Sequence, residues 1–213
     1  QVARVLTQVS LADYWLSDIS VGRSWDLSEN YQNETVFVDS FDTIRDLINW
    51  KNEFFLGSDQ SVILGVDYQK DKIDSTLNYD KTERDNTGIY GQYLGSLGKT
   101  DIQSSLRHDD NEQFGAETTG SLALGYSFDN AMRLTASYGT AFKAPTFNDL
   151  YYPYTVYNFG FGPYIYQGNP NLQPESSRSL EIGLSGDLSI VRWGLNLYQT
   201  DIDDLIELGK IGE

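Results

Sequence analysis

The sequence predicts an all-β protein, an antiparallel up-and-down meander of about ten strands that forms part of a transmembrane β-barrel. Three observations predict this class. Large apolar residues alternate with small or polar ones along most of the chain, as in strands with two different faces. Short and long connections alternate between these strands. The positions opposite the apolar rows are rich in Gly, Ser and Thr rather than in Lys and Glu.

The clearest pair of strands is a hairpin at residues 121–139. Asp129 and Asn130 separate its two alternating runs and are typical of a tight turn. Its large or apolar side chains occupy every second position: Leu122, Leu124, Tyr126, Phe128, Met132, Leu134, Ala136 and Tyr138. The other predicted strands cover residues 3–12, 19–27, 48–56, 62–68, 86–97, 100–109, 180–184 and 193–197. No segment shows the 3.6-residue period of a helix.

The connections predict two different ends of the sheet. Short turns are predicted near residue 13 and at 57–60, 98–101, 129–131 and 186–188, and longer loops at 28–41, 71–85, 109–117 and 140–177. Every second connection of a meander lies at the same end, so one end carries turns and the other carries loops. We therefore expect one partial barrel domain, residues 1–213, with short periplasmic turns and long extracellular loops, of which 140–177 is the main one.

Composition excludes several other classes of protein. The 15 Lys and Arg residues face 31 Asp and Glu residues, a formal charge of -16 that would repel a nucleic-acid backbone. No apolar run is long enough for a transmembrane helix. The absence of Cys removes disulfides and cysteine zinc sites. The first ten residues contain no signal peptide, so an exported protein would carry its signal outside this sequence.

A soluble β-sandwich is the main structural alternative, because its strands also alternate apolar and polar residues. Trp and Tyr near predicted strand ends favour the barrel, where aromatic girdles lie at the membrane interfaces. A sandwich could instead use its aromatic residues to bind carbohydrate.

The predicted loop that follows Tyr138 is unusually aromatic. Pro145 lacks a backbone donor and ends regular strand pairing. Nine aromatic residues then lie between Phe147 and Tyr166, interrupted by Pro153, Gly160, Gly162 and Pro163. These rings either pack on one another as a folded loop or form a stacking surface for a bulky ligand, and the two interpretations are compatible.

Five strings resemble the TonB-dependent outer-membrane receptors and, within them, the cobalamin receptors. They are GVDYQK (65–70), NTGIY (86–90), DDNEQFG (109–115), ASYGTAFKAP (136–145) and GNPNLQPE (168–175). The resemblance covers most of the chain. It implies a barrel of roughly 22 strands with a plugged lumen, in the outer membrane of a Gram-negative bacterium. It also implies import of a scarce ligand with energy from TonB, which would contact an N-terminal region that is missing here together with the plug.

The resemblance also implies a ligand and a set of contacts. Cobalamin is the expected ligand; the link over residues 146–167 is longer than in cobalamin receptors, so a siderophore or other metal-chelate receptor of the same family is the alternative. The predicted ligand contacts, through ring stacking and hydrogen bonding, are Tyr151, Tyr152, Tyr154, Tyr157, Phe159, Tyr164, Tyr166 and Asn169.

The acidic residues and the single histidine bear on metal binding and catalysis. Cobalamin receptors carry Asp-rich calcium loops, and the matching region here offers Asp26, Glu29, Asp39 and Asp42 as candidate calcium ligands, with a solvated acidic loop as the alternative. His108 precedes Asp109 and Asp110, which suggests a catalytic dyad, but no nucleophile accompanies it. We therefore predict a binding protein and not an enzyme.

Overall fold

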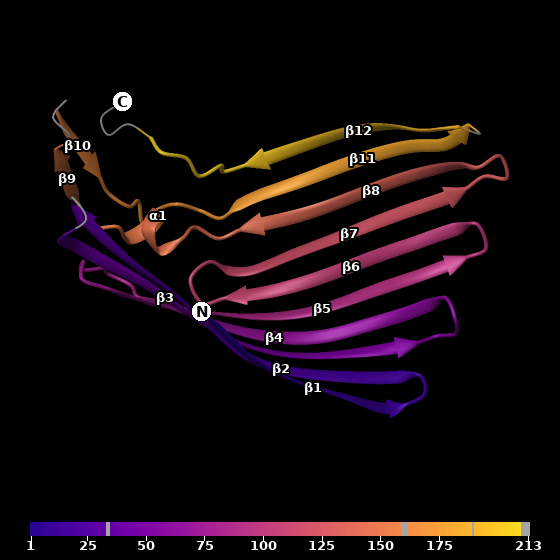
Figure 1. Ribbon diagram of the computed structural model, residues 1–213, viewed down its shortest axis with the longest axis horizontal. Helices are drawn as coiled ribbons and strands as arrows, with labels where there is room; N and C mark the ends of the chain where they lie inside the picture. Colours follow the sequence, from indigo (N-terminus) through magenta and orange to yellow (C-terminus); the bar gives the residue numbers. More distant parts are fainter. Residues whose placement is uncertain (33–34, 159–161, 189, 210–213) are drawn as a thin grey trace.

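A computed structural model describes the chain except for residues 33–34, 159–161, 189 and 210–213. Ten strands form one antiparallel sheet in the order β1-β2-β3-β4-β5-β6-β7-β8-β11-β12 (Figure 1). Their bounds are β1 Val2–Ala12, β2 Trp15–Gln32, β3 Val36–Phe55, β4 Gln60–Ser75, β5 Glu83–Leu97, β6 Thr100–Asn111, β7 Gly115–Ser127, β8 Met132–Lys143, β11 Glu175–Leu188 and β12 Val191–Asp203. The predicted antiparallel meander is confirmed. The described sheet is open, with β1 and β12 at its edges.

A short helix and a separate hairpin lie between β8 and β11. The helix α1 covers Phe147–Tyr151, and the hairpin pairs β9, Thr155–Asn158, with β10, Pro163–Tyr166. Five helical residues are too few to produce a recognisable period, so the sequence pattern did not reveal α1. Among the described residues, no helix has the length and apolar character needed to cross a membrane.

The strands extend further at one end of the sheet than alternation indicated. The predicted loop at 28–41 is mostly strand, because β2 and β3 remain paired as far as Gln32 opposite Val36, with a register shift after Asn30 opposite Asp39. The predicted loop at 109–117 shortens to residues 112–114, and the one at 71–85 to residues 76–82. The main connection covers residues 144–174. Consecutive polar residues, as at 28–30, and consecutive apolar residues, as at 36–38, removed the two-residue pattern from these strand ends.

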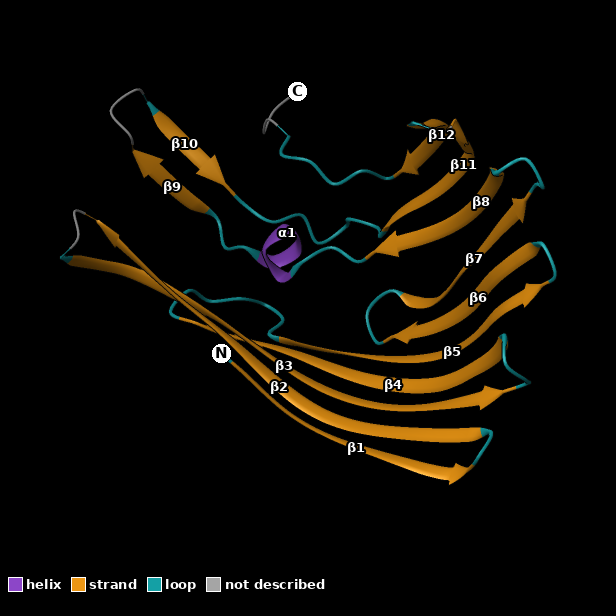
Figure 2. Cartoon of the chain, turned by 45° about the vertical axis from the view of Figure 1, so that its right-hand side comes forward, coloured by secondary structure: helices purple, strands orange, loops and turns teal. Residues whose placement is uncertain are grey.

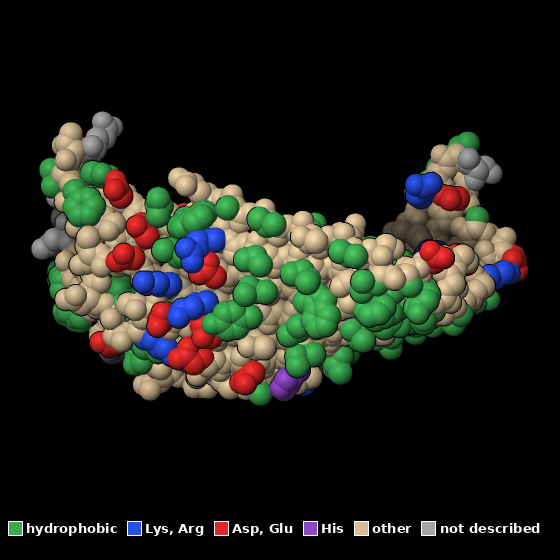
Figure 3. Space-filling model, turned by 90° about the horizontal axis from the view of Figure 1, so that it is seen from below, with side chains coloured by type: hydrophobic (Ala, Val, Ile, Leu, Met, Phe, Trp, Pro, Cys, Tyr) green, Lys and Arg blue, Asp and Glu red, His purple; other side chains and the backbone are tan. Residues whose placement is uncertain are grey.

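The two faces of the sheet differ sharply in chemistry. Ile19 pairs with Trp50, Trp50 with Val66, and Val66 with Ile89, so one apolar row crosses four strands. Such side chains form a band on the convex face, and charged side chains gather beside it near the loop end (Figure 3). The other face lines the hollow of the curved sheet (Figure 2). It carries polar pairs such as Asp18 with Lys51.

Little apolar side-chain surface is buried within the described residues. The buried hydrophobic residues are Ile73, Phe147 and Leu150, joined by Pro145. Val21 is 52% exposed and Trp50 48% exposed, although both lie in long strands. Because the described strands form one large sheet and a small hairpin, the apolar rows are not covered by a second sheet. The β-sandwich alternative is therefore wrong, and the apolar band stays uncovered in the part of the chain that the structure describes.

Candidate ligand-binding site

The connection 144–174, called here the aromatic segment, begins with a tightly capped helix. Thr146 caps α1: its Oγ1 accepts from the Asp149 amide at 3.1 Å, and its own amide donates to Asp149 Oδ2 at 2.8 Å. Together these bonds satisfy backbone donors that the first helical turn leaves unpaired. The buried face of α1 consists of Phe147 and Leu150. The helix therefore has a defined start and a defined inner side.

The chain returns to α1 after the β9–β10 hairpin and pairs with the end of the helix. The Gly168 amide donates to the Tyr152 carbonyl at 2.9 Å, and the Asn169 amide donates to the Asp149 carbonyl at 2.7 Å. A β-carbon added at Gly168 would lie 2.6 Å from backbone atoms of Leu150, Tyr151 and Tyr152. Only glycine permits this close approach, so the GNPNL string serves to close the segment on itself.

Aromatic rings connect the segment to the sheet. Tyr79, in the connection between β4 and β5, lies 5.5 Å from the Phe41 ring of β3 and 6.1 Å from the Tyr152 ring. Tyr152 is in turn 4.7 Å from Tyr166 in an edge-to-face arrangement, and its hydroxyl is 2.5 Å from that of Tyr157. Such ring pairs stabilise beyond simple burial, by about 0.5–1.5 kcal/mol each. The cluster therefore ties the aromatic segment to β3 and to the connection between β4 and β5.

Three phenols of this cluster have a raised pKa. Burial raises the pKa of the Tyr79 and Tyr152 phenols, and a hydrogen bond with Tyr157 acts in the same direction on Tyr152. Burial also raises the pKa of Tyr166. Because the folded-state values lie above the unfolded value of about 10, this contribution to stability is present below that pH and is lost as the pH rises through the folded-state pKa.

The hairpin side of the segment exposes other tyrosines beside a cavity. Tyr154 is 60% exposed and Tyr164 is 49% exposed. A cavity of about 380 Å³ is lined by Tyr164, Tyr166 and Asn169, three of the predicted ligand contacts. Its other lining residues are Asp149, Ile165, Gln167, Leu172 and residues 206–209. Rings, an amide and carboxylates at one opening suit a large ligand with both flat and polar parts.

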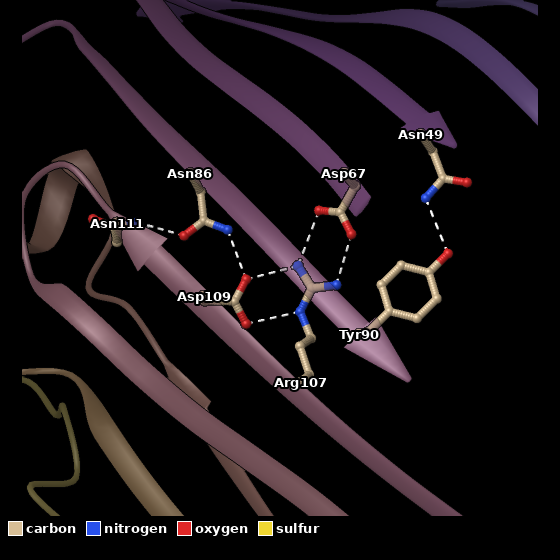
Figure 4. Close-up of polar contacts among 7 residues, drawn as sticks. All are labelled: Asn49, Asp67, Asn86, Tyr90, Arg107, Asp109 and Asn111. Carbon is tan, nitrogen blue, oxygen red and sulfur yellow. Dashed lines mark hydrogen bonds and ion pairs between the residues drawn. The ribbon is translucent and has the colours of Figure 1, made fainter. Parts of the chain in front are cut away.

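A polar network covers the inner face of the sheet (Figure 4). Arg107 on β6 donates to both oxygens of Asp67 on β4, at 2.7 and 2.9 Å, and to both oxygens of Asp109, at 2.7 and 2.6 Å. Asn86 extends the chain of contacts by donating to Asp109 at 2.7 Å and accepting from Asn111 at 3.3 Å. Each of these charged groups is therefore hydrogen-bonded, and the network, with one guanidinium and two carboxylates, carries a net negative charge.

Two glycines let long side chains lie flat on this wall. A β-carbon on Gly88 would lie 2.0 Å from Arg107 Nη2, and one on Gly65 would lie 2.3 Å from Tyr90 Cζ. The Tyr90 hydroxyl accepts from Asn49 at 3.2 Å (Figure 4). The large polar side chains of Tyr90 and Arg107 thus lie over Gly65 and Gly88, which explains the single Gly in each of GVDYQK and NTGIY.

The candidate catalytic and calcium residues are not brought together. His108 lies on the apolar face, next to Thr118 Oγ1 at 2.8 Å, whereas Asp109 lies in the inner network. The register of β2 and β3 puts Glu29 and Asp42 on one face and Asp26 and Asp39 on the other. Within the described residues no three acidic or histidine side chains form a metal-sized group. The geometry gives the four candidate calcium ligands no shared site.

The predicted ligand residues fall into two groups. Tyr154 and Tyr164 are exposed on the hairpin, and Asn169 lines the cavity while its Oδ1 accepts from the Asn171 amide at 3.0 Å. The side chains of Tyr152, Tyr157 and Tyr166 take part in the aromatic cluster, and Tyr151 accepts from Gln113 at 2.6 Å. Phe159 lies outside the described residues. Both interpretations of the loop, self-packing and exposed rings, therefore apply to different tyrosines.

Sequence reasoning missed the residues that anchor the segment from elsewhere in the chain. Tyr79 donates to Asn148 Oδ1 at 2.6 Å, and Gln113 comes from the turn between β6 and β7. Residues 206–209, after β12, complete the cavity. The DDNEQFG string contains Gln113 and was the one available signal; nothing local marked Tyr79 or the residues after β12.

An apolar convex face, a polar inner face and an elaborate connection at one end define a segment of a receptor barrel. The family model for the TonB dependent receptor-like β-barrel matches residues 5–212, and the chain belongs to this family. It is 34% identical to the vitamin B12 transporter BtuB of Photobacterium profundum, over 89% of this chain and 29% of that protein. It is 32% identical to BtuB of Vibrio vulnificus, over 94% of this chain and 32% of that protein. The chain thus spans about three tenths of these relatives.

Solved structures of the same architecture are more distant in sequence. A variant of the ferric enterobactin receptor PfeA of Pseudomonas aeruginosa, in complex with enterobactin, matches with a TM-score of 0.76 at 16% identity, over 98% of this chain and 35% of that chain. The siderophore receptor PirA of the same organism matches with a TM-score of 0.70 at 16% identity, over 94% of this chain and 45% of that chain. At this identity the likeness is evidence for the fold alone.

Proposed function

We propose that this chain forms part of the barrel of an outer-membrane receptor that binds cobalamin and imports it with energy supplied through TonB. The observation that carries the proposal is the 32–34% identity to vitamin B12 transporters over 89–94% of the chain. The open edges β1 and β12 would continue into the remaining strands of a Gram-negative outer-membrane barrel. TonB would act through an N-terminal region outside this chain.

Ligand binding in this proposal belongs to the aromatic segment. Cobalamin combines a flat, bulky ring system with many peripheral amides, and the segment presents exposed rings next to amides and carboxylates around the 380 Å³ cavity. Cobalamin is much larger than this volume, so the cavity would hold only one part of it. Siderophore receptors share the fold, and the long link over residues 146–167 keeps a ferric chelate as the alternative ligand.

Binding measurements on the complete receptor test the ligand. We expect saturable cobalamin binding at equilibrium and none of ferric enterobactin at the same concentration. Cells that depend on the receptor should grow on limiting cobalamin and stop when TonB is deleted. Binding of the ferric chelate in place of cobalamin would overturn the proposed ligand and leave the family assignment intact.

Tyr164→Ala is expected to weaken cobalamin binding about tenfold, because one stacked, partly exposed ring contributes on the order of 1 kcal/mol. Tyr14→Ala is the matched control, since Tyr14 is 60% exposed in the turn between β1 and β2, at the opposite end of the sheet. Equilibrium binding of cobalamin to both variants provides the measurement. Equal affinities for the two variants would remove Tyr164 from the ligand contacts.

The convex face is proposed to meet outer-membrane lipid. The strand register puts all four tryptophans, Trp15, Trp25, Trp50 and Trp193, on this face, and the indoles of Trp15 and Trp50 donate to Asn52 and Ser17 at 3.0 Å. Rings with satisfied donors suit an apolar surrounding.

Brominated acyl chains test this contact with lipid. In vesicles of brominated phosphatidylcholine we expect strong quenching of the receptor's tryptophan fluorescence, and Trp50→Phe should reduce the quenched fraction because Trp50 lies within the apolar band. Vesicles of the same lipid without bromine serve as the control. Fluorescence that is insensitive to bromination would contradict a lipid-facing convex surface.

A further inference from the structure

Arg84, at the start of β5, joins the sheet to the aromatic segment through three contacts. Its guanidinium lies 5.0 Å from the centre of the Phe147 ring and 5.8 Å from that of Phe114. Its Nη1 donates to the Pro145 carbonyl at 2.8 Å. One side chain of β5 thus touches the first turn of α1 and the turn between β6 and β7.

Arg84 differs from three arginines of the inner face that lie in ion pairs. Arg45 lies 2.6 Å from Asp71, Arg107 lies 2.7 Å from Asp67, and Arg133 lies 2.6 Å from Asp101. Within the described part of the chain, Arg84 has no carboxylate at ion-pair distance and is held by ring faces and a carbonyl instead. Its charge therefore interacts with ring faces and a carbonyl, mainly of the aromatic segment, and not with a carboxylate of the inner face.

The contacts of Arg84 reach the most deeply buried part of the segment. Pro145 and Leu150 are almost completely buried, and Phe147 is buried beside them. A cavity of about 240 Å³ lies beside Arg84, and its lining includes Arg45, Asp71, Asn111 and Ala144. A shorter side chain at position 84 would therefore adjoin open space.

We propose that Arg84 is a positioning residue that latches α1 to the barrel wall and so sets the place of the tyrosines that follow. Tyr79 and Gln113 also hold α1, through hydrogen bonds to Asn148 and Tyr151. The ligand part of this inference rests on the proposed function, because Arg84 would influence cobalamin only through the segment it holds. The latch itself is a property of the ligand-free protein.

Hydrogen–deuterium exchange on the complete, ligand-free receptor tests the latch. The amides that report docking are those of Leu150, Tyr152, Gly168 and Asn169, which bond within α1 or to its end. Arg84→Met removes the charge and the donor while keeping an unbranched side chain. We expect these four amides to exchange about tenfold faster or more, with the strand amides of β4–β6 unchanged. Arg84→Lys should recover part of the protection, because an ammonium group still attracts the ring faces.

Arg178→Met is the control, since Arg178 pairs with Asp203 on an exposed surface of β11 and β12. Unchanged exchange at α1 in Arg84→Met would overturn the latch, and so would faster exchange across all strands, which indicates general destabilisation. Cobalamin affinity, expected to fall about tenfold, is measured separately. A receptor that never binds cobalamin would refute the proposed function while the exchange data still decide the role of Arg84.

Discussion

Gly168→Ala should weaken cobalamin binding roughly ten- to hundredfold. The added β-carbon would lie 2.6 Å from three backbone atoms at the end of α1, and backbone cannot move aside as the tip of a side chain can. Overpacking of this kind costs about 1–3 kcal/mol, which corresponds to the expected change in affinity. The amides of Gly168 and Asn169 would lose their bonds to α1.

The measurement is equilibrium cobalamin binding by the complete receptor, with heat-modifiable gel mobility to show that the barrel itself is folded. Gly194→Ala is the matched control, because a β-carbon there would meet its nearest neighbour, Ser185 Cβ, at an ordinary 3.9 Å. We expect a folded barrel in both variants and weak binding only in the first. Full affinity in Gly168→Ala would show that residues 168–169 need not approach α1 so closely.

Arg107→Met should lower the free energy of unfolding by about 3 kcal/mol, because removing one partner of a buried ion pair leaves uncompensated charge. Here two carboxylates are affected: the Asp109 side chain is 4% exposed and that of Asp67 is 13% exposed. Arg107 alone joins them, with four hydrogen bonds of 2.6–2.9 Å. Urea unfolding of the receptor in lipid vesicles gives the change directly.

A compensating variant tests whether charge balance stabilises the Arg107 network. Combining Arg107→Met with Asp67→Asn and Asp109→Asn removes both orphaned charges, so most of the lost stability should return. Arg192→Met provides the control, since Arg192 pairs with Asp187 on a largely exposed surface and should change stability by less than about 1 kcal/mol. A triple variant no more stable than Arg107→Met would mean that packing of the long side chain, and not charge balance, stabilises the wall.

The strands could be predicted because their cause is local. A strand with one apolar and one polar face must alternate in sequence, and Leu122 to Phe128 does so without interruption. The prediction failed where that cause was absent. Asn30 and Asp39 pair in the extension of β2 and β3, yet residues 28–30 are all polar and residues 36–38 all apolar, so alternation carries no signal there. Family resemblance added the receptor class, through strings that the structure places in the strands of the sheet and in the aromatic segment.

The sequence predicted an aromatic segment as the candidate site, but it did not predict which of the aromatic residues are exposed. An excess of rings marked residues 147–166, but sequence alone could not separate Tyr164, which is exposed, from Tyr152, which is enclosed by Tyr79 and Tyr166. That distinction depends on a ring from a much earlier part of the chain. The acidic candidates depend on tertiary structure in the same way, since Asp26 and Asp42 belong to one region matched to calcium loops and lie on opposite faces of the hairpin.

The order of residues was sufficient to predict the two-faced meander, because successive side chains of a strand point to opposite faces of the sheet. This property is local and does not depend on the rest of the molecule. Folding in three dimensions decided which side chains meet across the sheet: that Arg84 holds Pro145 and Phe147, that Gln113 supports Tyr151, and that residues after β12 complete a cavity begun by Tyr164. These contacts join segments separated by tens of residues. Their energies depend on distance in space, which alternation along the chain does not encode.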